Sequence, residues 1–543
     1  MAISLSWQLL AQPQLWQLLV LAPLLIVSSL LITSIRRRRS PGQGALNLPP
    51  GPVRVPVLGN LHQLGSLPHR SLRELARRHG PVMLLHLGTV RTVVISSASA
   101  AKEVMKDQDV SCCSRPSSPG PSRLSYGLRD VAFAPYGEYW REMRRVFIVE
   151  LLSMRRVKAA WGARQEQVQK LVRVLSQGQK KKKPVALDEH IFRLADGIIG
   201  TVAFGNVYGT EMLAAHEDKE RRFHQVLDDA MDMLASFSAE DFFPNAAGRL
   251  VDRLTGLVSR RERIFKELDA FYETVIRQHL DPARPKPSNG GDLVDVLLSL
   301  PNEPRGTLSF TMDHVKALLM NTFVGGIDTS SVTILWAMSE LIRKPRVLKK
   351  VQEEIRAVVG SNGSDREPRV QPDDVPKLSY LKMVVKETLR LHPPATLLVP
   401  RETTRHVKIS GHDVPAKTRV LVNAWAIGRD AASWGEDAEE FDPDRFEPAA
   451  RSAGVDFHGA HFELLPFGSG RRVCPGIAMG AATVEFTLAS LLCSFDWALP
   501  EGTRAEELSM EEAGGLTFHR KTPLVLVPTA HPLRRPAAAV SVR

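Results

Sequence analysis

The sequence predicts one large, mainly helical body with small β-sheets, preceded by a single membrane-spanning helix. Helical patterns dominate the 543-residue chain, and the predicted strands are short and lie near Val82–Ser97, Val399–Val422 and the C-terminus. An apolar segment of about bilayer-spanning length lies near the N-terminus. No internal repeat is visible, and strands do not alternate with helices. A single α-rich body with small sheets is therefore favoured over an alternating parallel sheet.

The membrane anchor is expected at residues 15–35, after an N-terminal segment of residues 1–14. Leu15–Ile35 is apolar, and the cluster Arg36–Arg39 follows it at once. By the positive-inside tendency, this cluster places the C-terminal side in the cytosol. A cleavable signal peptide fits less well, because the basic cluster follows the apolar run and no small-residue cleavage site is evident. We expect an uncleaved anchor in the endoplasmic reticulum membrane with a cytosolic body.

Residues 36–56 combine this basic cluster with a proline-rich stretch. The proline-rich stretch spans Leu48–Pro52, and Pro56 follows it. Prolines restrict the backbone, so this segment can hold a globular body at a set angle to its anchor. The body is expected over residues 57–528, followed by a C-terminal tail at residues 529–543.

The net charge of +12 suits a nucleic acid, an anionic membrane or an acidic protein partner. No basic cluster is interleaved with aromatic residues as a nucleic-acid surface would be, so a membrane and a protein partner are favoured and no nucleic acid is expected. The chain has only four cysteines, which argues against a disulfide framework and favours a reducing environment.

One of these cysteines, Cys474, lies in a stretch suited to a thiolate bound to haem iron. Residues 467–476 read FGSGRRVCPG. Such a thiolate must be shielded from water and receive a few N–H donors. Gly470 and Gly476 allow tight turns around the sulfur, Arg472 can reach a haem propionate, and Phe467 can keep water away.

The pattern F-x-x-G-x-R-x-C-x-G is the haem-binding signature of the cytochromes P450, and the stretch matches every defined position. For a lone cysteine, a structural buried residue in a glycine-rich loop would be preferred. With the whole signature present, the chain resembles this family. The resemblance implies the cytochrome P450 fold and haem b (iron-protoporphyrin IX) as cofactor, with Cys474 as the axial iron ligand and Arg472 and Phe467 beside the haem.

Three further residues are expected at the haem. Trp140 and Arg144 are four positions apart in a helical stretch, so they share one face. The resemblance implies that this pair contacts a haem propionate and that Arg401 contacts one as well. Without the other motifs, Trp140 would be interpreted as an ordinary buried residue of a surface helix.

A candidate proton-delivery site lies in the long helical pattern Phe310–Lys344. Gly325–Ser330 reads GGIDTS, and its two glycines weaken the helix and leave space against a ligand. Thr329 can bond an i−4 carbonyl, which distorts a helix, and Asp328 adds a titratable group. The segment resembles the oxygen-activation motif of the family, which implies that Asp328 and Thr329 are catalytic.

A structural role is expected for Glu387, Arg390 and Arg445. Glu387 and Arg390 are three positions apart on one helix face, and the segment 441–446 supplies Arg445. The resemblance implies a buried charged network that supports the cysteine loop. An exposed ion pair is the alternative for the first two residues.

Several stretches, among them Leu151–Val157, Ala239–Asn245 and Gly515–Lys521, resemble plant microsomal members of the family that metabolise aldoximes in cyanogenic glucoside synthesis. This implies conversion of an aromatic aldoxime to a nitrile and then to an α-hydroxynitrile, with O₂ and electrons from NADPH delivered by a membrane-bound reductase. A hydroxylase of another plant metabolite (terpenoid, indole or phenolic) and a non-catalytic haem binder are the alternatives. By family analogy, the substrate pocket is expected at four segments: Ser114–Tyr126, Asn321–Ser330, Ala395–Val399 and Gly514–Phe518.

Overall fold

The computed structural model describes most of the chain beyond the expected anchor. The described residues are 46–178, 183–205, 226, 229–234, 238–284, 291–302, 309–360 and 369–532. The anchor at residues 15–35 and the basic cluster after it lie outside the described residues, as does most of the expected C-terminal tail.

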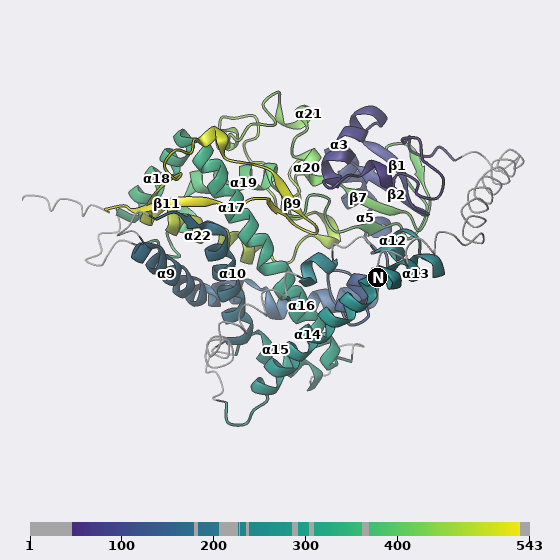
Figure 1. Ribbon diagram of the computed structural model, residues 1–543, viewed down its shortest axis with the longest axis horizontal. Helices are drawn as coiled ribbons and strands as arrows, with labels where there is room; N and C mark the ends of the chain where they lie inside the picture. Colours follow the sequence, from purple (N-terminus) through teal and green to yellow (C-terminus); the bar gives the residue numbers. More distant parts are fainter. Residues whose placement is uncertain are drawn as a thin grey trace, which may run out of the picture.

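Helices make up most of the described body, as the sequence predicts (Figure 1). They are α3 (Pro68–His79), α4 (Ala98–Lys102), α5 (Asp109–Cys112), α6 (Pro119–Leu124), α7 (Glu138–Val146), α8 (Met154–Ala159), α9 (Trp161–Gly178), α10 (Leu187–Phe204), α12 (Ala239–Phe242), α13 (Ala246–Leu254), α14 (Leu257–His279), α15 (Leu293–Ser299), α16 (Met312–Gly326), α17 (Asp328–Arg343), α18 (Pro345–Gly360), α19 (Ser379–Leu391), α20 (Ala424–Ile427), α21 (Ala431–Trp434) and α22 (Ile477–Ser494).

The strands form small sheets. A four-stranded sheet has the order β1 (Val82–Leu87), β2 (Val90–Ile95), β7 (Arg419–Val422) and β4 (Arg401–Glu402), and a three-stranded sheet has the order β3 (Val185–Ala186), β11 (Val525–Ala530) and β8 (Phe495–Ala498). Two pairs complete the set: β5 (Val407–Ile409) with β6 (His412–Val414), and β9 (Glu512–Gly514) with β10 (Phe518–Arg520). Strand β11 extends to Ala530, two residues into the expected tail.

The hairpin expected near residues 82–97 is confirmed. Strands β1 and β2 are antiparallel, with Leu87 opposite Val90. Gly88 has a φ of +61° at the turn, and a Cβ there would lie 2.5 Å from the carbonyl oxygen of Phe242. Glycine is therefore required where α12 lies against this turn.

The core lies among α10, α17, α18, α19 and α22, whose apolar side chains form one cluster. In Figure 1 these helices lie on the side opposite α3, β1 and β2. Among the described residues, the α16–α17 segment and α22 are long and apolar enough to cross a membrane, but 61% of the most apolar window in each is buried inside the protein. They are core helices of the body.

The long helical pattern over 310–344 is interrupted in the structure. Helix α16 ends at Gly326 and α17 begins at Asp328, with Ile327 at a φ of −81° and a ψ of −65° between them. Two glycines precede the break, and the Thr329 hydroxyl donates a 2.6 Å hydrogen bond to the carbonyl of Gly325. Weak helix formers and a back-bonding hydroxyl together account for the distortion.

Candidate active site

The loop that carries Cys474 is closed by its own backbone. The Cys474 N–H donates a 3.0 Å hydrogen bond to the carbonyl of Phe467. Gly470 has a φ of +68°, and a Cβ there would lie 2.2 Å from the carbonyl oxygen of Met105, so only glycine fits. Gly476 has a φ of −92°, which any residue adopts. The expectation that Gly476 is needed for a tight turn is therefore corrected.

The surroundings of the Cys474 sulfur act on the pKa of its thiol in opposite directions. Burial raises the pKa of its thiol above the usual value, while a hydrogen bond from the Gly476 backbone and the positive charge of Arg144 lower it. The chain alone thus favours the thiol. A metal cation bound at the sulfur would favour the thiolate instead.

Arg472 is buried and bonded to three backbone carbonyls. Its guanidinium donates to the carbonyl oxygens of Cys113 at 2.8 Å, Val131 at 3.2 Å and Ala134 at 2.6 Å. It also lies 4.0 Å from the ring centroid of Trp140. Burial lowers the pKa of Arg472 to about 9.

Trp140 and Arg144 lie on the same face of α7, as their spacing predicts. The Trp140 indole N–H donates a 2.9 Å hydrogen bond to the carbonyl of Val131. Arg144 donates to the carbonyl of Val473 at 2.5 Å, next to the cysteine. Trp140 therefore connects α7 to the loop at Val131, and Arg144 connects it to the residue before Cys474.

Arg401 has a carboxylate partner. It donates to Asp109 at 3.0 Å and to the carbonyl of Ser469 at 2.7 Å. Asp109 also accepts hydrogen bonds from the backbone and side chain of Arg471. This arrangement ties the segment after α19 to the cysteine loop.

Arg115 lies near Arg401 and Arg472, and together with Arg144 these residues form an arginine cluster. No sequence motif singled out Arg115 within the expected pocket segment. It donates to the carbonyls of Ala132 at 2.9 Å, Val399 at 2.5 Å and Pro400 at 2.8 Å. Burial and repulsion from Arg472 and Arg401 lower its pKa well below the usual value. No local sequence pattern marks such a residue, because its neighbours come from distant segments.

The cluster fits an anionic ligand. In the described part of the chain, the side-chain hydrogen bonds of Arg115, Arg144 and Arg472 go to backbone carbonyls rather than carboxylates. The nearby Asp130 carboxylate accepts from the Asn321 amide and from backbone N–H groups. Buried charges need partners, and the two propionates of a haem would supply them.

The break between α16 and α17 holds Asp328 and Thr329. The Asp328 carboxylate accepts a hydrogen bond from the Thr517 hydroxyl. Burial raises the pKa of Asp328, while the Thr517 bond and the charge of His519 lower it. Of the two glycines, only Gly325 faces open space. A Cβ at Gly326 would lie 2.7 Å from Cδ1 of Ile199, so the expectation that both leave room for a ligand is corrected.

The side chains of the expected pocket segments differ in what they contact. The Asn321 amide oxygen accepts from the N–H of Val131 at 2.9 Å, so this side chain holds a loop. Leu398 has a φ of +52°, and this left-handed turn directs Leu397, Leu398 and Val399 to three different apolar clusters. Val399 packs in the cluster that also contains Val324 and Leu516.

Glu387, Arg390 and Arg445 form a buried network. Both Glu387 oxygens accept from Arg390 at 2.7 Å, and one accepts from Arg445 at 2.9 Å. The side chains of Glu387 and Arg390 are 0% exposed and that of Arg445 is 7% exposed. The remaining donors of Arg390 bind backbone carbonyls, among them those of Gly428 and Ala438 at 2.6 Å each.

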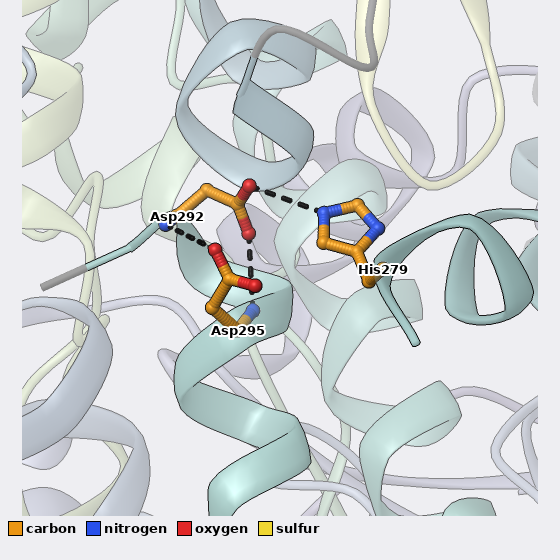
Figure 2. A group of neighbouring side chains, drawn as sticks. All are labelled: His279, Asp292 and Asp295. Atoms are coloured by element: carbon orange, nitrogen blue, oxygen red, sulfur yellow. Dashed lines mark hydrogen bonds and ion pairs between the residues drawn. The ribbon is translucent and has the colours of Figure 1, made fainter. Parts of the chain in front are cut away.

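A second group of titratable side chains lies at the start of α15 (Figure 2). Asp292 and Asp295 form a capping box, each accepting from the other's backbone N–H, and His279 lies 3.1 Å from Asp292. Arg284 donates to both carboxylates. Its guanidinium offsets one of their two negative charges, and both carboxylates are also used in the capping box, so we assign this group a structural role.

Comparisons with known proteins agree with this geometry. The family model described as Cytochrome P450 matches residues 49–527. The 4-hydroxyphenylacetaldehyde oxime monooxygenase of Sorghum bicolor is 63% identical over 99% of this chain and 100% of its own length. The 2-methylbutanal oxime monooxygenase of Manihot esculenta is 48% identical over 96% of this chain and 98% of its own length.

A solved structure shares the fold. A zebrafish cytochrome P450 with abiraterone superposes with a TM-score of 0.68 at 23% identity, covering 86% of this chain and 100% of that one. Together with the Cys474 loop and the arginine cluster, these matches show that the chain belongs to the cytochrome P450 family.

Proposed function

We propose that this haem monooxygenase converts an aromatic aldoxime, 4-hydroxyphenylacetaldehyde oxime or a close analogue, to an α-hydroxynitrile. The observation that carries the proposal is the 63% identity, over essentially the whole chain, to a relative named for that oxime. A second relative, at 48% identity, is named for an aliphatic oxime. The aldoxime group is common to both names, and the more similar of the two supports an aromatic substrate.

The reaction has two balanced parts. The aldoxime first loses water to give a nitrile, with no net oxidation. O₂ and two electrons from NADPH then place a hydroxyl group on the carbon next to the nitrile, and the second oxygen atom leaves as water. Haem bound through Cys474 supplies the activation of dioxygen.

The chain's own residues bind this group, exclude water and move protons. Phe467 shields the sulfur, and Asp328 and Thr329, at the break between α16 and α17, carry protons. The cationic and indole side chains of the cluster would hold the haem propionates: Arg115, Trp140, Arg144, Arg401 and Arg472.

Arg115 provides a test of this cluster. Arg115→Met is expected to lower haem affinity on the order of 10- to 100-fold, because a charge-assisted partner of a propionate is lost. The haem content of the purified protein, measured from its pyridine haemochrome, checks this. Arg123→Met removes a charge that faces Glu262 at 2.8 Å and is expected to leave haem content unchanged. Full haem content in Arg115→Met would contradict the assignment.

Cytochromes P450 use a redox partner. For this chain it is NADPH–cytochrome P450 reductase, and both proteins are held on the endoplasmic reticulum membrane. Two observations support membrane attachment. Residues 15–35 have the composition of an anchor, and apolar side chains are exposed at Val53 (87%), Val57 (67%), Leu250 (55%) and Leu254 (79%).

One preparation tests function, partner and localisation together. The chain is expressed in microsomes with a plant reductase and given 4-hydroxyphenylacetaldehyde oxime with and without NADPH. We expect nitrile as the first product, and 4-hydroxybenzaldehyde, which forms when the cyanohydrin breaks down, only when reductase and NADPH are present. The chain should stay with the membranes after an alkaline wash. If the oxime is recovered unchanged while the haem spectrum is intact, the substrate proposal fails. Hydroxylation of another plant metabolite then becomes the better hypothesis.

A further inference from the structure

The tip of the β9–β10 hairpin is held rigidly against α17. Gly514 has a φ of +138°, and a Cβ there would lie 2.1 Å from the carbonyl oxygen of Thr517. The Phe518 N–H donates to the carbonyl of Pro394 at 3.0 Å, and the Phe518 carbonyl accepts from the Trp336 indole at 3.1 Å. These contacts fix the backbone on the C-terminal side of Thr517.

Thr517 is buried, with 7% of its surface exposed, and its hydroxyl donates to the Asp328 carboxylate. Asp328 is the first residue of α17, directly after the break at Ile327. Among the described residues, His519 on the same hairpin is the titratable group whose charge acts on this carboxylate. Arg520 points instead to the Ser339 hydroxyl at 3.0 Å. The hydroxyl of Thr517 therefore decides where the Asp328 carboxylate lies.

The same tip also contacts the apolar side of the site. Leu516, the neighbour of Thr517, packs in the cluster that contains Phe323, Ile327 and Val399. Adjacent residues on one rigid turn thus reach the apolar interior and the carboxylate. The position of this turn therefore sets both the packing of Leu516 and the place of the hydroxyl that holds Asp328.

We propose that Thr517 is a positioning residue for Asp328, which couples the substrate-facing hairpin tip to proton delivery. The proposal rests on the role assigned above to Asp328. It gives one residue of the expected pocket segment Gly514–Phe518 a specific role that need not involve contact with substrate or haem.

Replacing Thr517 tests the contact directly. Thr517→Val keeps the shape of the side chain and removes the donor, whereas Thr517→Ser keeps the donor. Because the hydrogen bond favours the charged carboxylate, its loss should raise the pKa of Asp328 further. The electrons from NADPH should then reduce dioxygen to hydrogen peroxide instead of supporting hydroxylation. The yield of product per NADPH should fall about tenfold.

The first readout needs no substrate. Infrared spectra of the ferric holoenzyme are recorded against pH, and the Asp328 carboxyl band is assigned by its loss in Asp328→Asn. We expect an upward shift in Thr517→Val and none in Thr517→Ser. Thr487→Val is the matched control, because the Thr487 hydroxyl is buried with no hydrogen-bond partner in the described part of the chain.

The second readout is product and hydrogen peroxide per NADPH with the oxime. Adding Thr517→Val to the Asp328→Asn enzyme should cause no further loss of product per NADPH, because both changes act through one carboxylate. An Asp328 band that titrates in Thr517→Val as in the unmodified enzyme would overturn the proposal. Absence of product from the unmodified enzyme would overturn the substrate assignment instead, and the infrared result would still decide the role of Thr517.

Discussion

Replacing Cys474 with alanine is expected to abolish both the thiolate-type spectrum of the reduced, CO-bound haem and all NADPH-dependent product. Cys474 supplies the sulfur around which the loop from Phe467 closes, and alanine has no atom that can bind iron. Absorbance spectroscopy of the purified protein and product analysis in microsomes measure the two losses.

Cys493→Ala is the matched control for this change. Cys493 is buried in α22, and burial raises the pKa of its thiol to about 11. This thiol stays protonated and inert, so its loss should leave the spectrum and the product unchanged. A Cys474→Ala protein that keeps the thiolate-type spectrum would contradict the assignment of the iron ligand.

Glu387→Gln is expected to destabilise the protein by roughly 3–5 kcal/mol, because it leaves two buried guanidinium groups without their counter-charge. Arg390 and Arg445 both donate to this carboxylate. The Asp442 N–H also donates to it at 2.9 Å, so the chain around Asp442 should loosen as well. The thermal unfolding midpoint of the holoenzyme and its haem content check this.

Glu74→Gln provides the comparison on the surface. Glu74 pairs with Arg78 at 2.8 Å, with side chains that are 49% and 68% exposed. Exposed pairs of this kind contribute little to stability, so the midpoint should not change measurably. Equal effects of the two substitutions would show that Glu387 acts as an ordinary surface carboxylate.

Much of the fold could be predicted from the sequence, because its signals are local. The β-branched runs around Gly88 predicted the β1–β2 hairpin. The glycine pair and the back-bonding position of Thr329 predicted a distorted helix. The motif around Cys474 predicted the family. In each case the residues that determine the structure lie within a few positions of one another.

The site could be predicted only in part. The resemblance predicted Arg472, Trp140 and Arg144 as neighbours of the haem, but not that they bind the backbone carbonyls of Cys113, Val131 and Val473. The sequence treated Gly325 and Gly326 alike, whereas Ile199 on α10 closes the space beside Gly326. It placed Asn321 in the expected pocket segment but did not indicate that this side chain holds the loop at Val131.

The sequence by itself determined the chemistry of this protein: a cysteine in a loop suited to a haem thiolate, and an acid and a hydroxyl at a helix break. Only the tertiary structure decided which distant groups meet there. Arg472 reaches the carbonyl of Cys113 across 359 positions, and Thr517 reaches Asp328 across 189. Such contacts depend on how whole helices and sheets pack, since no local pattern records which segments will be neighbours.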